Sequence, residues 1–205
     1  MKRCGLLIAV ILALLAFSRD TSAQKEATED EAKAAYIINF GKYVEWPIAT
    51  LPNADTPLVI GVLGDDSIVS LIRTLVGTKT VNGHKVVVNS LRWPKTPKNA
   101  KELRDSGVPK DSKEFKEFKD CHMLYIAQSE SARGDELIRL MRGIPTLLIA
   151  DFPNFARHGG HINFILDVDH ILLEVNPESA RQSDLTISSR LLGNAKPVQT
   201  GPSWR

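Results

Sequence analysis

The segment PLVIGVLGDDS, residues 57–67, decides the fold class. Its first eight residues form a continuous apolar run of strand length, and Asp65, Asp66 and Ser67 then supply side-chain oxygens that cap a helix. The run that follows, IVSLIRTLV, is amphipathic, and its inward side is formed by Ile68, Leu71, Ile72 and Leu75. A strand that is apolar on both faces and leads into such a helix is typical of a parallel sheet covered by helices.

The same pattern recurs along the chain. Three more apolar segments have strand length, at 85–91, 122–127 and 145–150. The spacing of apolar residues predicts a helix over 29–46, ended by Pro47, and another over 131–141. Residues 161–176 change to two strands around residues 167–170, close enough for a hairpin. We therefore predict an α/β fold: a single compact domain with a mostly parallel central sheet, flanked by helices, and a C-terminal β-hairpin.

The N-terminus, residues 1–23, has the composition of a secretory signal peptide. Lys2 and Arg3 precede an apolar run, and small residues precede an expected cut after Ala23. The apolar run is shorter than the about 20 residues that a spanning helix needs, and no later segment is apolar for that long. We expect an exported protein without direct membrane insertion, with its α/β domain over 24–195 and a flexible tail over 196–205.

Residues 92–120 differ from the rest of the domain. They are charged, contain three prolines and are nearly free of aliphatic side chains. We expect a charged surface excursion with a short helix near 113–118, serving either as decoration or as a partner contact.

Charge and cysteine content narrow the function classes. Removing residues 1–23 takes away three basic side chains and one acidic one, which leaves 23 of each sign from the 26 and 24 of the whole chain. A formally neutral chain gives no reason to expect nucleic acid as a partner. Cys121 then stands alone, so it cannot form a disulfide within the chain. Its apolar setting favours a small buried residue, and an intermolecular disulfide stays an open alternative.

The segment RHGGHINF, residues 157–164, carries the residues most suggestive of chemistry. A His-Gly-Gly loop could stabilise an oxyanion, but the G-x-S-x-G nucleophile motif is absent from the chain. His158 and His161 could share a metal ion with a third ligand, although the spacings of real metal sites are missing. The candidates for that third ligand are His122, His170 and Asp151.

We predict neither a metal nor a catalytic residue in this segment. Gly159 and Gly160 are instead expected to supply backbone freedom at a turn. The flanking histidines receive no catalytic or metal-binding role here, and Asn163 is expected to satisfy nearby backbone groups.

The segment IGVLGDDS is similar to a dinucleotide-binding loop but lacks its third glycine. Its two aspartates would repel the phosphates that a helix N-terminus otherwise attracts. We therefore expect helix capping here, and no cofactor.

Five segments in order resemble the YfiR-like family of small exported regulators. They are KAAYIINFGKYVEWP (33–47), LVIGVLGDD (58–66), CHMLYIA (121–127), FARHGGHINF (155–164) and ISSRLLG (187–193). The resemblance implies a periplasmic, non-enzymatic protein that binds the periplasmic region of an inner-membrane diguanylate cyclase and holds it inactive, limiting cyclic di-GMP and biofilm formation. Other members accompany membrane histidine kinases or outer-membrane receptors. The chain departs from the family in its single mature cysteine and in the length of residues 92–120.

The leading hypothesis is therefore a repressor that contacts a membrane-bound signalling protein, with a homodimer as a further option. Aromatic and arginine side chains dominate binding hot spots. The candidate contact residues are Lys42, Glu45, Trp46, Arg157, His158 and Arg190. Two alternatives remain: a small-ligand-binding sensory module, since α/β sheets form crevices at strand ends, and a hydrolase using His158, which lacks a nucleophile.

Overall fold

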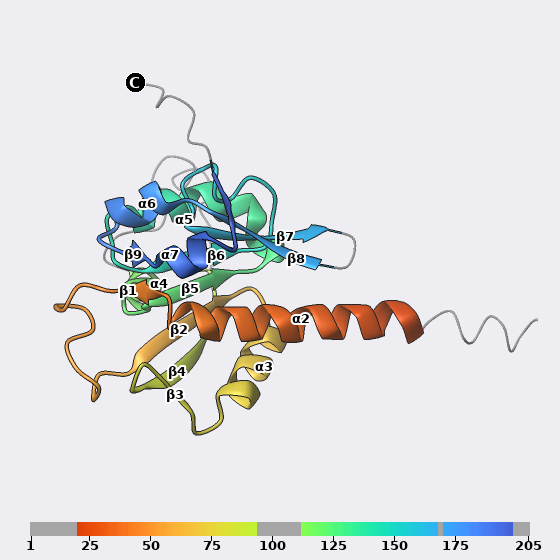
Figure 1. Cartoon of the computed structure of the whole chain (residues 1–205), viewed down its shortest axis with the longest axis horizontal. Coiled ribbons are helices and arrows are strands. Elements are labelled where there is room, and N and C mark those ends of the chain that lie inside the picture. Colours follow the sequence, from red (N-terminus) through yellow and green to blue (C-terminus); the bar gives the residue numbers. More distant parts are fainter. Residues whose placement is uncertain (1–19, 94–111, 168–169, 199–205) are drawn as a thin grey trace, which may run out of the picture.

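An eight-stranded sheet forms the centre of the molecule (Figure 1). The computed structural model describes residues 20–93, 112–167 and 170–198, with side chains from residue 29 onward. The strands lie in the order β10-β8-β7-β6-β5-β2-β4-β3. Their bounds are Leu58–Leu63 for β2, Thr80–Val81 for β3, His84–Leu91 for β4, Met123–Ile126 for β5, Leu147–Ala150 for β6, Ile162–Asp167 for β7, His170–Val175 for β8 and Lys196–Pro197 for β10.

Most neighbouring strands are parallel, as predicted. The run from β4 through β2, β5 and β6 to β7 is parallel throughout. β8 returns antiparallel to β7, with Asp167 opposite His170, which confirms the C-terminal hairpin. β3 is antiparallel to β4, and β10 is parallel to β8. The chain leaves β2 for β4 on one side and returns to β5 on the other, so the strand order reverses between β2 and β5. In open α/β sheets, ligands bind at the carboxyl ends of strands beside such a reversal.

Helices cover both faces of the sheet, because each face is apolar. One face packs against α2 (Asp20–Phe40), α3 (Asp66–Val76), α6 (Pro177–Gln182) and α7 (Ser189–Leu192). Its core includes a stack of Phe40 on Phe164, with ring centroids 5.8 Å apart. The other face packs against α4 (Lys113–Lys119) and α5 (Gly134–Met141), which continues from the 3₁₀ helix η1 (Gln128–Arg133).

The first helix ends earlier than predicted, at Phe40 instead of residue 46. The chain turns at Gly41, where an added Cβ would lie 2.8 Å from side-chain atoms of both Leu58 and Val81. It then forms β1 (Val44–Glu45), which pairs antiparallel with β9 (Thr186–Ile187). Because this partner strand lies far along the chain, the local apolar spacing could not reveal it.

The charged segment 92–120 is partly built into the core. The short helix expected near residues 113–118 is confirmed as α4, with Ser112 as its cap. Phe115 and Phe118 are 4% and 1% exposed and join the second core cluster, so this end of the segment is not a surface excursion. Residues 94–111 lie outside the described residues, as do residues 1–19 of the expected signal peptide and residues 199–205 of the expected tail. Lys196–Pro197, at the start of that tail, form β10.

Two buried histidines accept hydrogen bonds from the backbone of neighbouring strands at the amino ends of these strands. His122 accepts a hydrogen bond at Nδ1 from the backbone N–H of Val59, 3.0 Å away, and its Nε2 donates to the carbonyl of Thr50. His161 accepts at Nδ1 from the N–H of Leu148, also at 3.0 Å. Burial lowers the pKa of both imidazoles, and the pKa of His161 falls to about 3. Both rings are therefore neutral near pH 7, and His161, for which the sequence predicted no role, is a structural residue.

The Gly-Gly pair before β7 acts as the turn that the sequence predicted. Gly159 has a φ of 111°, in the region that favours glycine. At Gly160 an added Cβ would lie only 2.2 Å from Cε1 of Phe155, whose ring is buried. Asn163 is buried, and its Oδ1 has no hydrogen-bond partner among residues 20–93, 112–167 and 170–198, so the expectation that its side chain satisfies nearby backbone is wrong for that oxygen.

Substituting Gly160→Ala should lower the free energy of unfolding by about 1–3 kcal/mol, because overpacking forces buried neighbours to move. Urea unfolding followed by circular dichroism would measure the change. Gly193→Ala is the matched control, since its Cβ would meet no atom closer than 3.4 Å. Equal stability of the two variants would contradict the close approach of Phe155 to Gly160.

The buried neutral state of His161 predicts a pH dependence of stability. The folded pKa of about 3 lies below the ordinary value of 6.5, so the unfolded chain binds more protons between these values. The stabilisation is complete above about pH 6.5 and is lost as the pH falls, by at most about 1.4 kcal/mol per pH unit. In His161→Asn the amide oxygen retains an acceptor but does not titrate. Its stability difference from the wild type should shrink between pH 6 and pH 4, and parallel urea-unfolding curves across this range would refute the prediction.

Candidate functional site

Four of the six predicted contact residues lie on neighbouring segments. Lys42, Glu45 and Trp46 surround β1, and the backbone N–H of Ser188 donates to the carbonyl of Tyr43 at 2.8 Å. This bond and the β1–β9 pairing bring the first segment beside α7, which carries Arg190 (Figure 1). We call this region the amino-end face, because it borders the amino end of β5. It comprises Lys42, Glu45, Trp46, Ile48 and Arg190.

Trp46 is both a packing residue and a surface residue. It is partly buried against the first core cluster, and its indole N–H donates to the carbonyl of His122 at 3.1 Å. The indole also meets the His122 ring edge-on, with centroids 6.2 Å apart. Ile48, which the sequence reasoning did not single out, is 81% exposed two residues further on. Its signal was an aliphatic residue directly after Pro47, in a segment that packs against no predicted element.

Arg157 and His158 are bound to other parts of the domain. Arg157 donates from Nε to Glu174 in β8 at 3.1 Å, and His158 lies 2.8 Å from Asp135 in α5. His158 is exposed, whereas His161 is turned into the core against Leu148. The two histidines therefore do not converge on a shared metal position.

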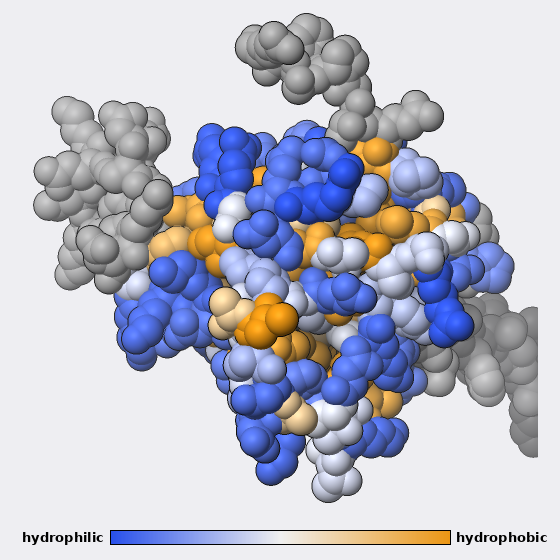
Figure 2. Space-filling view, turned by 60° about the vertical axis from the view of Figure 1, so that its left-hand side comes forward, coloured by the Kyte–Doolittle hydropathy of each residue, from blue (hydrophilic) through white to orange (hydrophobic). Residues whose placement is uncertain are grey.

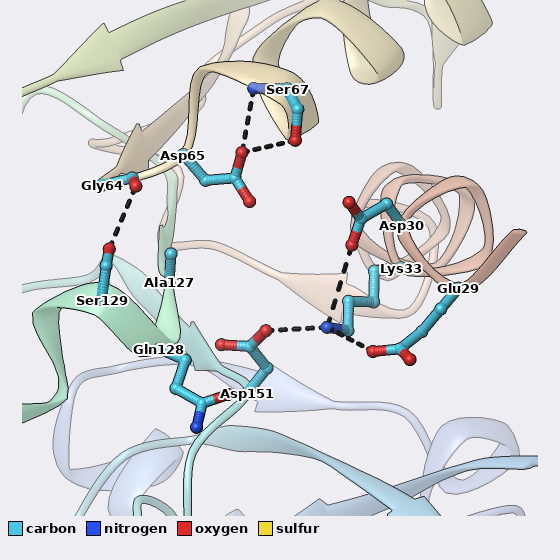
Figure 3. Close-up of a pocket in the computed structure, with 10 residues that line it drawn as sticks. All are labelled: Glu29, Asp30, Lys33, Gly64, Asp65, Ser67, Ala127, Gln128, Ser129 and Asp151. Atoms are coloured by element: carbon cyan, nitrogen blue, oxygen red, sulfur yellow. Dashed lines mark hydrogen bonds and ion pairs between the residues drawn. The ribbon is translucent and has the colours of Figure 1, made fainter. Parts of the chain in front are cut away.

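A charged pocket of about 530 Å³ opens at the carboxyl ends of the central strands (Figure 3). It lies where the strand order reverses, between the residues that follow β2 and β5, with Asp151 after β6. Helix α2 closes it from the other side. Its charged lining residues are Glu29, Asp30, Lys33, Asp65 and Asp151, and we call it the carboxyl-end pocket.

Lys33 forms the centre of an ion-pair network in this pocket. Its side chain is 7% exposed, and Nζ lies 2.8 Å from Asp151 Oδ2, 2.7 Å from Glu29 Oε1 and 4.0 Å from Asp30 Oδ1. Burial alone would lower the pKa of Lys33, but the hydrogen bonds to Asp151 and Glu29 outweigh burial and raise that pKa. The ammonium is therefore charged and held in place, and it is not a base.

Asp151 is bonded through only one of its oxygens. The hydroxyl of Tyr125 donates to Oδ2 at 2.8 Å, beside the Lys33 bond. Burial, followed by the charge of Asp151, raises the pKa of Tyr125, which makes this tyrosine a permanent donor near neutral pH. Oδ1 of Asp151 is buried and has no hydrogen-bond partner in the part of the chain that the structure describes. The pocket thus presents fixed charges and an unfilled acceptor, an arrangement suited to binding.

Cys121 is placed as a structural residue. Its thiol is 2% exposed and donates to the carbonyl of Glu117. Burial, followed by the charges of Asp120 and Glu117, raises its pKa to about 12, so the reactive thiolate is scarce near neutral pH. A disulfide to another chain would require this thiol to leave the core.

Two features of the sequence indicate the carboxyl-end pocket, although neither entered the prediction of the contact residues. Asp65 and Asp151 each follow an apolar strand, and the carboxyl ends of parallel strands meet at one edge of the sheet. Lys33 precedes Ile37 and Phe40 by four and seven positions, which places a lysine on the buried side of an amphipathic helix. A charged residue in that position predicts a buried partner.

In the part of the chain that the structure describes, no helix has the length and apolar character needed to cross a bilayer.

Two solved structures are distantly similar to this chain. A conserved domain protein from Vibrio cholerae O1 biovar El Tor is 14% identical, with a TM-score of 0.48, over 74% of this chain and 57% of that one. The ABC domain in complex with L-Trp from Streptococcus pneumoniae is 12% identical, with a TM-score of 0.49, over 81% of this chain and 62% of that one. This chain therefore spans less than two thirds of either protein. No curated protein matches it.

A protein-family model described as YfiR/HmsC-like matches residues 30–196. The match runs from α2 to β10 and includes both the amino-end face and most of the carboxyl-end pocket. It confirms the resemblance carried by the five segments of the sequence. The chain belongs to the YfiR/HmsC-like family of periplasmic regulators.

Proposed function

We propose that this periplasmic regulator binds the periplasmic region of an inner-membrane diguanylate cyclase and holds that enzyme inactive, which limits cyclic di-GMP and biofilm formation. The family supports a regulator with a periplasmic signalling partner. The exposure of Ile48 supports the proposed contact surface most directly. Its side chain is 81% exposed beside the partly buried Trp46.

The amino-end face has the chemistry of a protein-binding surface. Hot spots place aromatic or aliphatic anchors at the centre and charged groups at the rim. Here Trp46 and Ile48 supply the anchors, and the exposed side chains of Lys42, Glu45 and Arg190 supply charges of both signs. Figure 2 brings this side of the molecule forward and shows apolar side chains set among hydrophilic ones.

Trp46 is held in a fixed position before any partner arrives. Its indole N–H is bonded to the carbonyl of His122, and its ring lies against the His122 imidazole. A side chain that is already ordered loses little conformational entropy on binding, so more of its contact energy contributes to affinity. This preorganisation favours Trp46 as the central anchor and Ile48 as the neighbour that inserts into the partner.

Repression follows from differential affinity for two states of the cyclase. A regulator that binds the inactive state more tightly shifts the population toward it without any chemical step. Moving an equilibrium from 1:99 to 99:1 requires a preference of about 10⁴-fold, or about 5.5 kcal/mol. A few well-packed anchors that contact only the inactive state, each contributing about 2 kcal/mol or more, reach this magnitude.

Ile48→Asp should weaken binding to the cyclase at least about tenfold, or about 1.4 kcal/mol, because it places a charge in the apolar contact. Capture of solubilised inner-membrane proteins on the purified regulator, followed by mass spectrometry, identifies the cyclase. Calorimetry with the periplasmic region of that cyclase measures the affinity. Cells carrying Ile48→Asp should contain more cyclic di-GMP than wild-type cells, in the direction of cells without the regulator.

Leu166→Asp is the matched control. Leu166 is also an exposed aliphatic residue, 57% exposed, but it lies on the β7–β8 hairpin, at the opposite end of the molecule in Figure 1. Its substitution should change the affinity by less than about twofold. Unchanged binding by Ile48→Asp, or capture of a histidine kinase or outer-membrane receptor in place of a cyclase, would overturn the proposal.

A further inference from the structure

We propose that the carboxyl-end pocket is a binding site for a small organic cation that carries two or more ammonium groups, of the diamine or polyamine class. The proposal concerns a site at the other end of the strands from the amino-end face. It goes beyond the proposed function, and its test contains no partner protein.

The charge of the pocket selects the sign of the ligand. Among the described residues that line the pocket, four carboxylates, from Glu29, Asp30, Asp65 and Asp151, surround one ammonium, that of Lys33. Lys33 is already bonded to Asp151 and Glu29, so it does not offer a free positive charge to an anion. The pocket is therefore strongly electronegative, and clefts lined by one sign of charge concentrate ligands of the opposite sign.

The pocket lies where α/β proteins often bind phosphate, but its donors are occupied. A helix N-terminus attracts anions through its free N–H groups. At the start of α3, Asp65 Oδ1 accepts from the N–H groups of Ser67 and Ile68 at 2.9 and 3.2 Å. The side chain that caps the helix thus fills the anion position and adds a negative charge, which turns an anion site into a cation site.

Asp151 and Asp65 each direct one carboxylate oxygen toward a ligand. Among the described residues, Oδ1 of Asp151 has no hydrogen-bond partner, and the side chain is only 9% exposed. Figure 3 shows this oxygen directed away from Lys33, toward Ala127 and Gln128. The hydrogen bonds of Asp65 all use Oδ1, and Figure 3 shows its other oxygen directed into the space between α3 and α2.

A buried acceptor without a donor destabilises the protein, and a donor supplied by a ligand removes that cost. An ammonium group carries three N–H donors and forms charge-assisted bonds to carboxylates. Gln128, which lies beside Asp151 in Figure 3, is exposed, so its side chain can rotate to admit such a group. Binding would therefore satisfy Asp151 Oδ1 as well as neutralise charge.

The spacing of the carboxylates favours an organic cation over a metal ion. Among the described residues, no three His, Cys, Asp or Glu side chains are grouped closely enough to hold a metal. The carboxylates instead come from α2, from the end of β2 and from the end of β6. A ligand whose charges are separated by a carbon chain can reach several of them at once. The volume of about 530 Å³ lies within the range of small-molecule sites, about 300–1,000 Å³.

Isothermal titration calorimetry of the purified protein with spermidine tests the proposal. We expect saturable binding to one site that weakens with added salt. Asp65→Asn should lower the affinity about five- to tenfold, because it removes one carboxylate charge from the pocket. Asparagine caps a helix as well as aspartate does, so this variant should keep α3 and the fold. Its circular dichroism and thermal melt check that expectation.

Asp66→Asn is the matched control. Asp66 is the neighbouring residue, but its side chain is 69% exposed and bonds to Ser90 and Arg92 outside the pocket. Its substitution removes the same charge from the same helix and should change the spermidine affinity less than twofold. Equal losses in both variants would show non-specific attraction and overturn the proposal.

Two further titrations exclude other ligands. Inorganic phosphate should not bind at the pocket, and magnesium chloride should not give a saturable site that Asp65→Asn abolishes. Either result, or the absence of saturable spermidine binding by the folded wild-type protein, would overturn the proposal. None of these outcomes bears on the cyclase contact, which is measured with a different ligand and a different variant.

Discussion

The buried ion pair between Lys33 and Asp151 fixes the first helix to the centre of the sheet. The two residues are 118 positions apart in the chain, and their bond of 2.8 Å joins α2 to the carboxyl end of β6. Removing one partner of a buried pair typically costs about 3–5 kcal/mol, because the other charge stays buried without compensation. Asp151 also accepts the hydroxyl of Tyr125, so the same carboxylate fixes a strand side chain of β5. The position of α2, the walls of the carboxyl-end pocket and the geometry of its acids all depend on this contact.

Local patterns predicted those parts of the fold whose stabilising contacts are close in sequence or repeated. The strands β2, β5 and β6 are buried on both faces. Burial on both faces appears in the sequence as a continuous apolar run, so these strands could be predicted. The end of α2 was not predicted, because β1 exists only through its pairing with β9, about 140 residues later. The burial of the two phenylalanines of α4 was not predicted, for a different reason. The segment around this short amphipathic helix is charged and contains prolines, which is typical of an exposed loop.

The candidate sites show the same limit. The sequence offered Trp46 as a candidate contact residue, but only the structure shows its partial burial and the bond to His122 that orders it. Two of the four acids of the pocket carried a local signal, since Asp65 and Asp151 follow strands. Their meeting depended on the strand order, in which β5 lies beside β2 and not beside β4. Strand order is a non-local property, so a list of strands in one sequence could not place Lys33 between these carboxylates.

The ionisable groups buried at the two ends of the strands differ in charge. This difference distinguishes the amino-end face from the carboxyl-end pocket. At the amino ends, His122 and His161 are buried in the neutral state and bind backbone groups, so they add no charge beneath the amino-end face. At the carboxyl ends, Lys33 and Asp151 are buried as a charged pair, and further acids surround them. Neutral buried groups suit a face that contacts protein through apolar anchors. An unpaired charge there would cost free energy when the partner excludes water from the face. Buried charged groups suit a pocket that selects a ligand by the sign of its charge, because the low dielectric constant of the pocket walls strengthens each electrostatic interaction. The proposed contact surface and the proposed ligand pocket therefore lie at opposite ends of the strands and differ in how their ionisable groups are buried.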